Sequence, residues 1–313
     1  MGTTITGWGS ALPDKVVTNA DFESYLDTSD TWIVERTGIR ERRFGGSTAG
    51  LAEQAARVAL ECAERDPATI SYLLLATTTP DWTIPATSSA LHAALGCGGG
   101  AFDLNAACAG FVYALVVADS LCRTTPGTNA LVIGSDTLSR VTDQRDRATA
   151  VLFGDGAGAV VVEHAPGESL IVAHDLGVDG SAVPILNAPI GGTIYMEGRE
   201  VYRRAVRAEL NSITAVLEKS GLAPEDLALF VPHQANVRII EAVNERLGIP
   251  MEKTAIVLDR TGNTSAASIP FALCEAAGEG RIKAGDLVLL SGFGAGMTWA
   301  SAIIRWGVAG PQA

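Results

Sequence analysis

Positive charge is scarce in this chain of 313 residues, in which 23 lysines and arginines stand against 35 aspartates and glutamates and leave a formal net charge of −12. Because the phosphates of a nucleic acid require a broad positive surface, this deficit argues against a nucleic-acid partner. Arginine nevertheless outnumbers lysine 19 to 4. The planar guanidinium suits phosphate and carboxylate groups, so local binding sites for a phosphorylated cofactor or an acidic carrier protein are possible. For any single arginine, a place on a solvated helix face is the simpler explanation.

Cysteine is too scattered for two of its common structural roles. The five cysteines are odd in number and show no C-x-x-C spacing, so the sequence predicts neither a disulfide framework nor a zinc site. We expect no metal, and we expect a free thiol to remain reduced. The five residues are Cys62, Cys97, Cys108, Cys122 and Cys274.

The sequence also shows no sign of export or membrane insertion. Residues Met1 to Thr6 do not form a basic region followed by an apolar stretch, and no uninterrupted apolar run approaches the length needed to cross a bilayer. We therefore expect a cytoplasmic protein without a membrane contact. Its length and its 47% hydrophobic content predict a large core, divided between two packed units.

A repeated pattern of short apolar runs is present in each half of the chain. Short runs that alternate with helical patterns predict βαβ units around a buried parallel sheet, and their duplication predicts two α/β halves, 1–165 and 166–313. The predicted strands are 72–76, 101–104 and 130–133 in the first half, and 228–231, 255–258 and 287–290 in the second. The predicted helices are 49–65, 109–122, 201–219, 237–247 and 269–277. The Gly- and Pro-rich stretch 167–193 is predicted to cross between the halves.

Cys108 lies in the run N-A-A-C-A-G-F, just after a predicted strand and just before an almost wholly apolar helical run. At a helix N-terminus, unpaired backbone N–H groups and the helix dipole favour the thiolate, which is the reacting form of cysteine. The small neighbours leave room for a substrate carbonyl. Cys108 is therefore predicted to be a nucleophile, and the alternative is a buried structural cysteine.

His233 and Asn263 each follow a predicted strand of the second half. Sites in open α/β sheets form beyond the carboxyl ends of the strands, and a pseudo-twofold relation between the halves would set Asn263 opposite Cys108. A cysteine can accept an acyl group, while neutral His and Asn side chains can donate hydrogen bonds to an enolate oxygen. Together the three residues predict chemistry on a thioester. Taken singly, a core histidine and a turn asparagine remain the alternatives.

Two glycine-rich stretches border this predicted site. The run 154–158 precedes an apolar run instead of opening a helix, so we interpret it as a tight turn lining the Cys108 pocket and not as a phosphate loop. The run 291–297 follows the last predicted strand, where small residues let backbone N–H groups face a ligand. It could supply a donor to an oxyanion hole.

With these motifs in order, the chain resembles β-ketoacyl-acyl-carrier-protein synthase III, the condensing enzyme that initiates bacterial fatty acid biosynthesis. The resemblance covers essentially all 313 residues. It rests on six ordered motifs: D-T-W-I-V-E-R-T-G-I at 30–39, A-C-A-G-F at 107–111, F-G-D-G-A-G-A at 153–159, P-H-Q-A-N at 232–236, G-N-T-S-A-A-S at 262–268 and G-F-G-A-G at 292–296. It implies the thiolase fold, an α/β fold of duplicated halves in five αβαβα layers.

The resemblance implies an acyltransferase that performs a decarboxylative Claisen condensation. Cys108 would accept the acyl group of an acyl-CoA starter, and His233 and Asn263 would hold the thioester oxygen of malonyl-acyl-carrier protein during decarboxylation. The backbone N–H groups of Cys108 and Ala295 would form the oxyanion hole. No cofactor is implied, because the coenzyme A thioester is a substrate.

The resemblance also assigns residues to the binding of coenzyme A and the carrier protein. Trp32 and Arg147 match positions that flank the adenine of coenzyme A, and Arg36 matches one near its phosphates. Asn236 matches a residue lining the pantetheine tunnel. Arg238 matches a basic residue on which the acidic carrier protein docks.

The resemblance further implies a homodimer in which the segment around Ile84 reaches toward the acyl pocket of the partner subunit. Many members carry an aromatic residue at that position, so Ile84 leaves the size of the pocket, and hence the acyl starter, open. Two alternatives to fatty acid initiation remain. One is a related priming ketosynthase or acyltransferase of a secondary-metabolite (polyketide) pathway, and the other is a catalytically inactive scaffold subunit, against which the intact Cys108, His233 and Asn263 speak.

Overall fold

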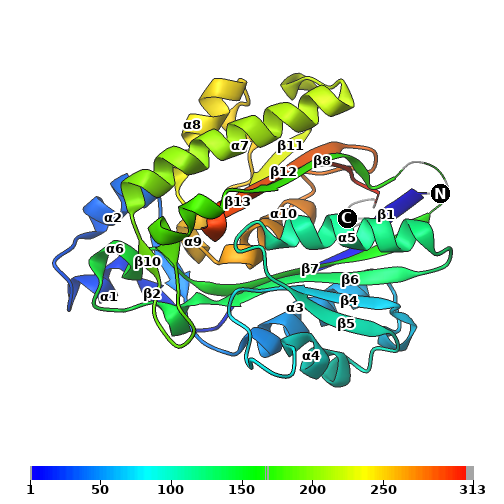
Figure 1. Ribbon diagram of the computed structural model, residues 1–313, viewed down its shortest axis with the longest axis horizontal. Helices are drawn as coiled ribbons and strands as arrows, with labels where there is room; N and C mark the ends of the chain where they lie inside the picture. The colour runs from blue at the N-terminus through cyan, green and yellow to red at the C-terminus, as the bar shows by residue number, and fades with distance from the viewer. Residues whose placement is uncertain (1, 166, 168, 308–313) are drawn as a thin grey trace.

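The computed structural model describes residues 2–165, 167 and 169–307, and arranges two sheets and three layers of helices in alternation (Figure 1). The first sheet has the strand order β1-β7-β6-β4-β5. Strands β4, β5 and β6 pair in parallel, whereas β7 is antiparallel to both β6 and β1. The strands are β1 (Gly2–Ala11), β4 (Tyr72–Ala76), β5 (Gly100–Leu104), β6 (Asn129–Thr137) and β7 (Asp155–Ala165).

The second sheet has the order β11-β12-β13-β8, with only β11 and β12 in parallel. Its strands are β8 (Ile171–Val178), β11 (Leu229–Pro232), β12 (Leu287–Gly294) and β13 (Thr298–Arg305). The outer layers are α3 (Thr48–Cys62) and α4 (Thr87–Leu95) on the first sheet, and α7 (Gly198–Ser220) with α8 (Val237–Leu247) on the second. Figure 1 shows these layers from bottom to top.

The middle layer consists of α5 (Gly110–Thr124) and α10 (Ser268–Gly278), which lie between the two sheets (Figure 1). By length and hydropathy alone the segment Ala107–Thr124 could cross a membrane, and 61% of it is buried. Its apolar side chains, Phe111 and Leu115 among them, belong to the core that both sheets share. A helix with a sheet on each side is apolar around most of its circumference, so its place in the core accounts for its composition.

Two glycines let α10 and the turn before it approach the first sheet closely. A Cβ atom at Gly134 would lie 2.2 Å from the carbonyl oxygen of Ala266, and one at Gly158 would lie 2.5 Å from the backbone nitrogen of Phe271. Any side chain at these positions would push the middle layer away from β6 and β7. The glycines therefore set the distance between the first sheet and the segment that carries Asn263.

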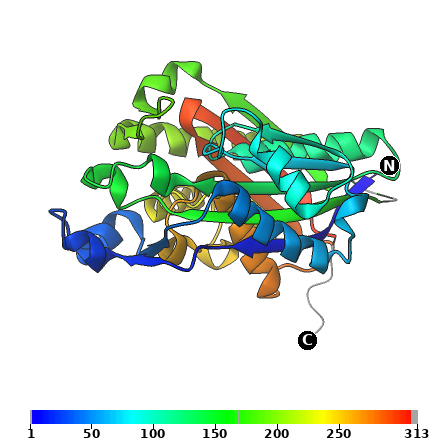
Figure 2. The ribbon, with the colours of Figure 1, turned by 90° about the horizontal axis from the view of Figure 1, so that it is seen from below.

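The smaller elements gather at one end of the layered body. In both views α1, α2 and α6 lie at that end together with the β9–β10 hairpin (Figures 1 and 2). They are β2 (Val16–Thr18), α1 (Asn19–Glu23), α2 (Asp30–Thr37), β3 (Glu41–Arg43), α6 (Arg147–Ala150), β9 (Leu186–Asn187), β10 (Tyr195–Met196) and α9 (Leu258–Thr261).

All five predicted helices and five of the six predicted strands are confirmed, with exact ends for strand 72–76 and helix 237–247 and shifted ends for the others. The strand predicted at 255–258 is wrong, because a buried side chain takes the place of a neighbouring strand there. The side-chain oxygen of Gln234 accepts hydrogen bonds from the N–H groups of Val257 (3.0 Å) and Leu258 (3.2 Å), and its side-chain NH₂ group donates to the Ala255 carbonyl (3.1 Å). The apolar run is therefore a buried loop that leads into α9.

Two loop predictions are also corrected. The stretch 167–193 is not only a connection, because it contains the edge strand β8, which pairs with β13. The first side chains of β8 alternate between buried and exposed, as expected for a strand with one face against the protein core. The run 154–158 belongs to the start of β7, paired with β1 and β6, so it does not turn beneath the pocket. The predicted boundary after residue 165 adjoins residue 166, which lies outside the described residues, and it stays a prediction.

Candidate active site

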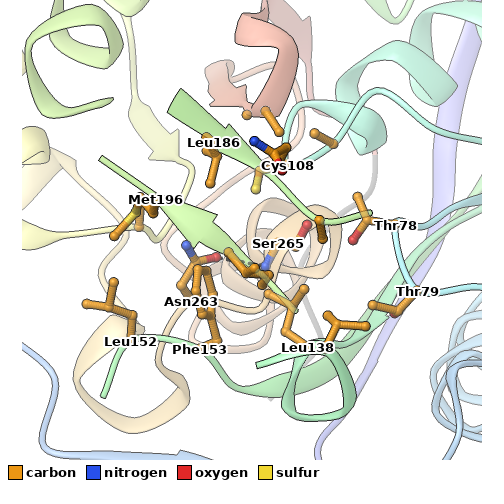
Figure 3. Close-up of a pocket in the computed structure, with 18 of the residues that line it drawn as sticks. Thr78, Thr79, Cys108, Leu138, Leu152, Phe153, Leu186, Met196, Asn263 and Ser265 are labelled. Carbon is orange, nitrogen blue, oxygen red and sulfur yellow. Dashed lines mark hydrogen bonds between the residues drawn. The ribbon is translucent and has the colours of Figure 1, made fainter. Parts of the chain in front are cut away.

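A cavity of about 1620 Å³ opens at the end of the molecule where the small elements gather. Cys108, His233 and Asn263 all line it, although the chain separates Cys108 from His233 by 125 residues and His233 from Asn263 by 30. Figure 3 shows Cys108, Ser265 and Asn263 among the residues that line this cavity, together with Leu186 and Met196 of the β9–β10 hairpin. The structure thus brings together the three residues that the sequence predicts to act on a thioester.

Cys108 occupies the tight connection between β5 and α5, as predicted. Ala107 has a φ of 50°, and its carbonyl accepts the N–H of Gly110 at 2.9 Å, which turns the chain sharply into the helix. The side-chain oxygen of Asn105 accepts the Ala107 N–H at 3.0 Å. A left-handed alanine is strained, and such strain persists only where the surroundings fix it. This turn presents the Cys108 side chain to the cavity.

The ionisation of Cys108 differs from the sequence prediction. Part of the residue faces the cavity, but burial of its thiol raises the pKa to about 12, and the carboxyl of Asp136 adds to that shift. A hydrogen bond with Ser265 and the backbone N–H of Cys108 lower the pKa, although by less. Desolvation therefore outweighs the helix N-terminus, and the resting side chain is a thiol and not the expected thiolate.

His233 is buried, with 2% of its surface exposed, at the end of β11. Burial lowers its pKa to about 3, so the imidazole is neutral at physiological pH. Its Nδ1 lies 2.6 Å from the hydroxyl of Ser268, and its ring meets the edge of Phe293 at a centroid distance of 5.4 Å. The backbone N–H of His233 donates to the Ser291 carbonyl at 2.7 Å. The ring is thus held by Ser268 and Phe293, and the backbone of the residue by Ser291.

Asn263 is also buried, and its amide has a defined orientation. The Ser265 N–H donates to the Asn263 side-chain oxygen at 2.9 Å. Its backbone is fixed by two further bonds, from its N–H to the Leu152 carbonyl (2.8 Å) and from the Gly154 N–H to its carbonyl (2.9 Å). Because the side-chain oxygen is occupied, the NH₂ group is the part of Asn263 left to act on a ligand.

The backbone around Cys108 approaches the end of β12 in the second sheet very closely. A Cβ atom at Gly294 would lie 2.5 Å from the backbone nitrogen of Cys108. Gly294 and Ala295 both line the cavity. Only glycine permits this approach, which brings the N–H groups of Cys108 and Ala295 to the same wall.

Trp32 and its two arginines lie at the mouth of the cavity. The guanidinium carbons of Arg36 and Arg147 each stand 4.9 Å from the Trp32 ring, which is the geometry of a cation–π contact. Arg147 also donates to the Asp27 carbonyl at 2.7 Å. Trp32 and Arg36 line the cavity, whereas Arg147 reaches it only through Trp32.

Asn236 and Arg238 line the cavity as well, at the start of α8. The Asn236 side chain caps the helix by accepting the Arg238 N–H at 2.9 Å, and it donates to the Arg36 carbonyl at 2.9 Å. It therefore joins α8 to α2 in addition to bordering the cavity. Arg238 is exposed at the rim.

Ile84 does not line the cavity of its own chain, although Thr83 and Ala86 do. Its side chain is 87% exposed. This placement separates Ile84 from the acyl site within one subunit. It also leaves the side chain free to contact another protein surface.

Four further residues shape the site, and the sequence analysis gave them no role. Gln234, Ser265 and Ser268 lie within the family motifs at 232–236 and 262–268, and their place in those motifs is the feature from which a role could have been predicted. Asp136, by contrast, is a buried carboxylate at the end of β6 whose Oδ2 accepts the Ala266 N–H at 2.9 Å. Nothing in its sequence surroundings indicates this contact, because its partner lies in the other half of the chain.

The described residues contain no group of three or more His, Cys, Asp or Glu side chains that could hold a metal ion. Besides aspartates and arginines, the cavity lining contains a thiol, a neutral imidazole, a carboxamide and backbone N–H groups. A nucleophile beside neutral hydrogen-bond donors suits acyl transfer through a covalent thioester.

Comparison with known proteins agrees with this arrangement. Residues 102–180 match the family of 3-oxoacyl-[acyl-carrier-protein] synthase III, and residues 217–306 match its C-terminal family. A β-ketoacyl-[acyl-carrier-protein] synthase III of Roseiflexus sp. (strain RS-1) is 47% identical over 321 residues, which cover 96% of this chain and 98% of that protein.

Solved structures give the same result. The 3-oxoacyl-[acyl-carrier-protein] synthase III of Aquifex aeolicus VF5 is 47% identical and matches with a TM-score of 0.95 over 97% of this chain and 100% of that one. The priming β-ketosynthase of the R1128 polyketide biosynthetic pathway is 35% identical, with a TM-score of 0.93 over 99% and 97%. The five layers are those of the thiolase fold, as predicted. The chain belongs to the β-ketoacyl-[acyl-carrier-protein] synthase III family.

Proposed function

We propose that this protein joins the acyl group of an acyl-CoA to malonyl-acyl-carrier protein by decarboxylative Claisen condensation, and so initiates fatty acid biosynthesis. The observation that carries the proposal is the meeting of Cys108, His233 and Asn263 in one cavity, with the Asn263 oxygen occupied and the imidazole neutral. Donors that carry no charge and are already oriented suit an oxygen that becomes negative only during the reaction.

In the first half-reaction, the sulfur of Cys108 attacks the thioester carbonyl of acyl-CoA. The oxygen that becomes negative is held by the backbone N–H groups of Cys108 and Ala295, and the C–S bond to coenzyme A then breaks. Because burial keeps Cys108 a thiol, its proton is lost as the C–S bond forms and leaves with the coenzyme A thiol. An acyl-Cys108 thioester remains.

In the second half-reaction, malonyl-acyl-carrier protein loses its carboxylate as CO₂. The electron pair of the broken C–C bond forms an enolate, whose oxygen accepts hydrogen bonds from His233 and Asn263. The enolate carbon attacks the acyl-Cys108 carbonyl and releases the Cys108 thiolate, which regains a proton. The product is a β-ketoacyl-carrier protein.

Coenzyme A is proposed to enter past Trp32, with its adenine between the indole and Arg147 and its phosphates near Arg36. The Arg147 guanidinium already stacks on the Trp32 ring, so it would need to make way for the adenine. Asn236 borders the path of the pantetheine arm, and Arg238 at the rim offers a positive charge to the acidic carrier protein. Trp32→Ala and Arg147→Ala should raise KM for acyl-CoA and leave the malonyl half-reaction unchanged.

We further propose a cytoplasmic homodimer. Among the described residues, strand β5 pairs with β4 alone and leaves its other edge open, and Phe102 on that strand is 37% exposed. An open edge beside exposed apolar side chains such as Ile84 is a ready surface for a second copy. Light scattering of the purified protein tests the dimer. Comparing kcat/KM for acetyl-, isobutyryl- and hexanoyl-CoA before and after Ile84→Phe tests whether Ile84 reaches the acyl pocket of the partner subunit, since an unchanged ranking would mean that it does not.

Mass spectrometry of the intact protein after mixing with a panel of acyl-CoAs tests the first half-reaction. The acyl mass should map to the peptide with Cys108, vanish in Cys108→Ala and persist in the matched variant Cys62→Ala, which removes an exposed thiol. Label on another cysteine would contradict the proposal. His233→Ala and Asn263→Ala should slow decarboxylation by about 10² or more while part of the self-acylation survives, as expected for a lost oxyanion donor.

A priming ketosynthase of a polyketide pathway is the second candidate, and the likeness to the R1128 enzyme favours it. The two functions share both half-reactions and differ in the acyl starter and in the carrier protein. The acyl-CoA panel therefore discriminates them when each acyl-enzyme is offered malonyl groups on fatty acid and polyketide carrier proteins.

A further inference from the structure

The hydrogen bond between His233 and Ser268 raises a question that the proposed function leaves open, namely which ring nitrogen carries the proton. Nδ1 lies 2.6 Å from the Ser268 hydroxyl oxygen. The imidazole is buried and neutral, so only one of its nitrogens bears a hydrogen. The hydroxyl of Ser268 decides which one.

Ser268 Oγ has two partners among the described residues. Besides Nδ1 of His233, it receives the backbone N–H of Gln234 at 3.3 Å. A backbone N–H can only donate, so Oγ accepts from Gln234. The hydroxyl hydrogen then has one acceptor within reach, the lone pair of Nδ1.

The opposite arrangement leaves a buried hydrogen without an acceptor. If Nδ1 carried the proton, Oγ would accept from both Nδ1 and Gln234, and its own hydrogen would face no acceptor. Ser268 is 1% exposed, so water does not readily replace the missing partner. A buried polar hydrogen without an acceptor costs free energy, which favours the arrangement in which Ser268 donates.

We infer that Ser268 is a positioning residue that fixes His233 in the tautomer whose Nε2–H, and not a lone pair, is free for the cavity. The inference rests on the proposed function, in which His233 donates a hydrogen bond to the enolate oxygen. It adds that the Ser268 hydroxyl is the group that makes His233 a donor. It also follows that Nε2 cannot take the proton of Cys108, because a nitrogen that already carries a hydrogen in a neutral ring has no free lone pair.

One short segment would then orient both donors. The Ser265 N–H occupies the Asn263 oxygen, and three residues later Ser268 occupies Nδ1 of His233. Asp136 holds this segment from the first half of the chain through the Ala266 N–H. Residues 263–268 thus orient the hydrogen-bond donors of Asn263 and His233 toward the enolate site before a substrate binds.

The tautomer can be measured directly. In protein labelled with ¹⁵N at histidine, long-range ¹H–¹⁵N spectra distinguish a protonated from an unprotonated ring nitrogen, and His233→Asn identifies the signal. Wild-type protein should show Nε2 protonated and Nδ1 bare, and Ser268→Ala should show a mixture. A wild-type spectrum with the proton on Nδ1 of His233 would overturn the inference, whether or not Ser268→Ala folds.

Kinetics provide the second measurement. Ser268→Ala should slow malonyl decarboxylation by about 10- to 100-fold, the usual effect of removing a partner that orients a functional histidine, while self-acylation of Cys108 stays within about twofold. Ser268→Thr keeps the hydroxyl and should restore most of the rate. The matched control is Ser301→Ala, which removes another buried serine hydroxyl, paired with Ser291 at 3.0 Å and without a hydrogen bond to the His233 ring in the described structure.

The outcomes separate this inference from the proposed function. Unchanged decarboxylation and an unchanged tautomer in Ser268→Ala would overturn the positioning role of Ser268 alone. Failure of the wild-type protein to acylate or decarboxylate would contradict the proposed function, and the wild-type spectrum would still decide the tautomer. Equal losses in Ser268→Ala and Ser301→Ala would assign the effect to general packing and overturn the inference.

Discussion

Asp136 and Glu209 are both completely or almost completely buried, and burial raises the pKa of each, but their surroundings differ sharply. Asp136 Oδ1 receives the backbone N–H groups of Thr78 (2.7 Å) and Thr79 (3.1 Å) together with three threonine hydroxyls, and Oδ2 receives the Ala266 N–H. These hydrogen bonds oppose the effect of burial on its pKa. Asp136 therefore acts as an acceptor that joins the two halves beside the site.

Glu209 lies on the inner side of α7, against the outer face of the second sheet. Its Oε1 has no hydrogen-bond partner in the described structure, and neither has the nearby helix residue Ser212 through its hydroxyl. Burial raises the pKa of Glu209 to about 8, and a hydrogen bond with Ser291 opposes this only in part. A buried carboxyl group whose oxygens are fully hydrogen-bonded fixes the positions of its neighbours, whereas a buried carboxyl group with few hydrogen bonds lowers the stability of the fold.

The largest effect should come from removing the better-satisfied group. Asp136→Leu leaves the backbone N–H groups of Thr78 and Ala266 without an acceptor, whereas the Thr79 N–H keeps the Thr77 hydroxyl at 3.1 Å. We therefore expect a loss of about 4 kcal/mol in the free energy of unfolding, at about 1–3 kcal/mol for each of the two groups. Decarboxylation should fall as well, because residues 263–268 lose their anchor. Urea unfolding measures the first effect, and the control Asp136→Asn, which keeps one oxygen, should lose less. A loss below about 1 kcal/mol would mean that water replaces the carboxylate.

The second effect is a pH dependence from Glu209. Its folded pKa, about 8, exceeds its ordinary value, so the folded state holds a proton that the unfolded state releases, and stability falls as pH rises between the two values. One such group contributes about 1.4 kcal/mol per pH unit, or about 3 kcal/mol between pH 5.5 and 8. Glu209→Gln should remove this part of the slope. Parallel stability curves for the two proteins would contradict the prediction.

The third effect concerns a hydroxyl beside Asp136. Thr79 donates to Asp136 at 2.9 Å and accepts the Thr137 N–H at 2.8 Å. Thr79→Val keeps the shape but leaves that N–H unpaired, so we expect a loss of about 2 kcal/mol in the free energy of unfolding. Chemical denaturation measures it. A neutral result would show that the polar network around Asp136 tolerates gaps.

The smallest effect should have the opposite sign. Ser212 is buried and its hydroxyl has no partner among the described residues, so Ser212→Ala removes a polar group that gains nothing from burial. We expect the protein to become more stable by up to about 1 kcal/mol. Thermal and urea unfolding measure the change. If Ser212→Ala destabilised the protein as Thr79→Val does, the contrast between the two polar regions would be wrong.

The site shows how far a linear pattern can reach. Cys108 and His233 could be singled out because each follows a strand, and Cys108 also has small neighbours. Asn263 stands in a short polar turn, but the strand expected before it is absent. The ionisation of Cys108 could not be predicted in this way. The helix N-terminus is a local feature that favours the thiolate, but the desolvation that outweighs it comes from segments distant in sequence.

The false strand at 255–258 has the same cause. Four apolar residues in a row are what a buried strand requires, and they are indeed largely buried. Whether they pair with a neighbouring strand depends on what meets their backbone, and here Gln234 supplies the acceptor. Gln234 lies about twenty residues earlier, in the P-H-Q-A-N motif whose histidine was the predicted site residue, so no local pattern predicts its contact with 255–258.

By itself, the sequence predicted five of the strands, five of the helices and a repeated α/β fold, and it singled out Cys108, His233 and Asn263 as candidate reactive side chains, because periodicity and turn chemistry act over a few residues. Only the tertiary structure decided the protonation of Cys108, the orientation of the Asn263 amide, the hydrogen bond on His233 and the contrast between Asp136 and Glu209. Each of these depends on desolvation and on donors that approach from distant segments, and such contacts exist only once the layers have packed.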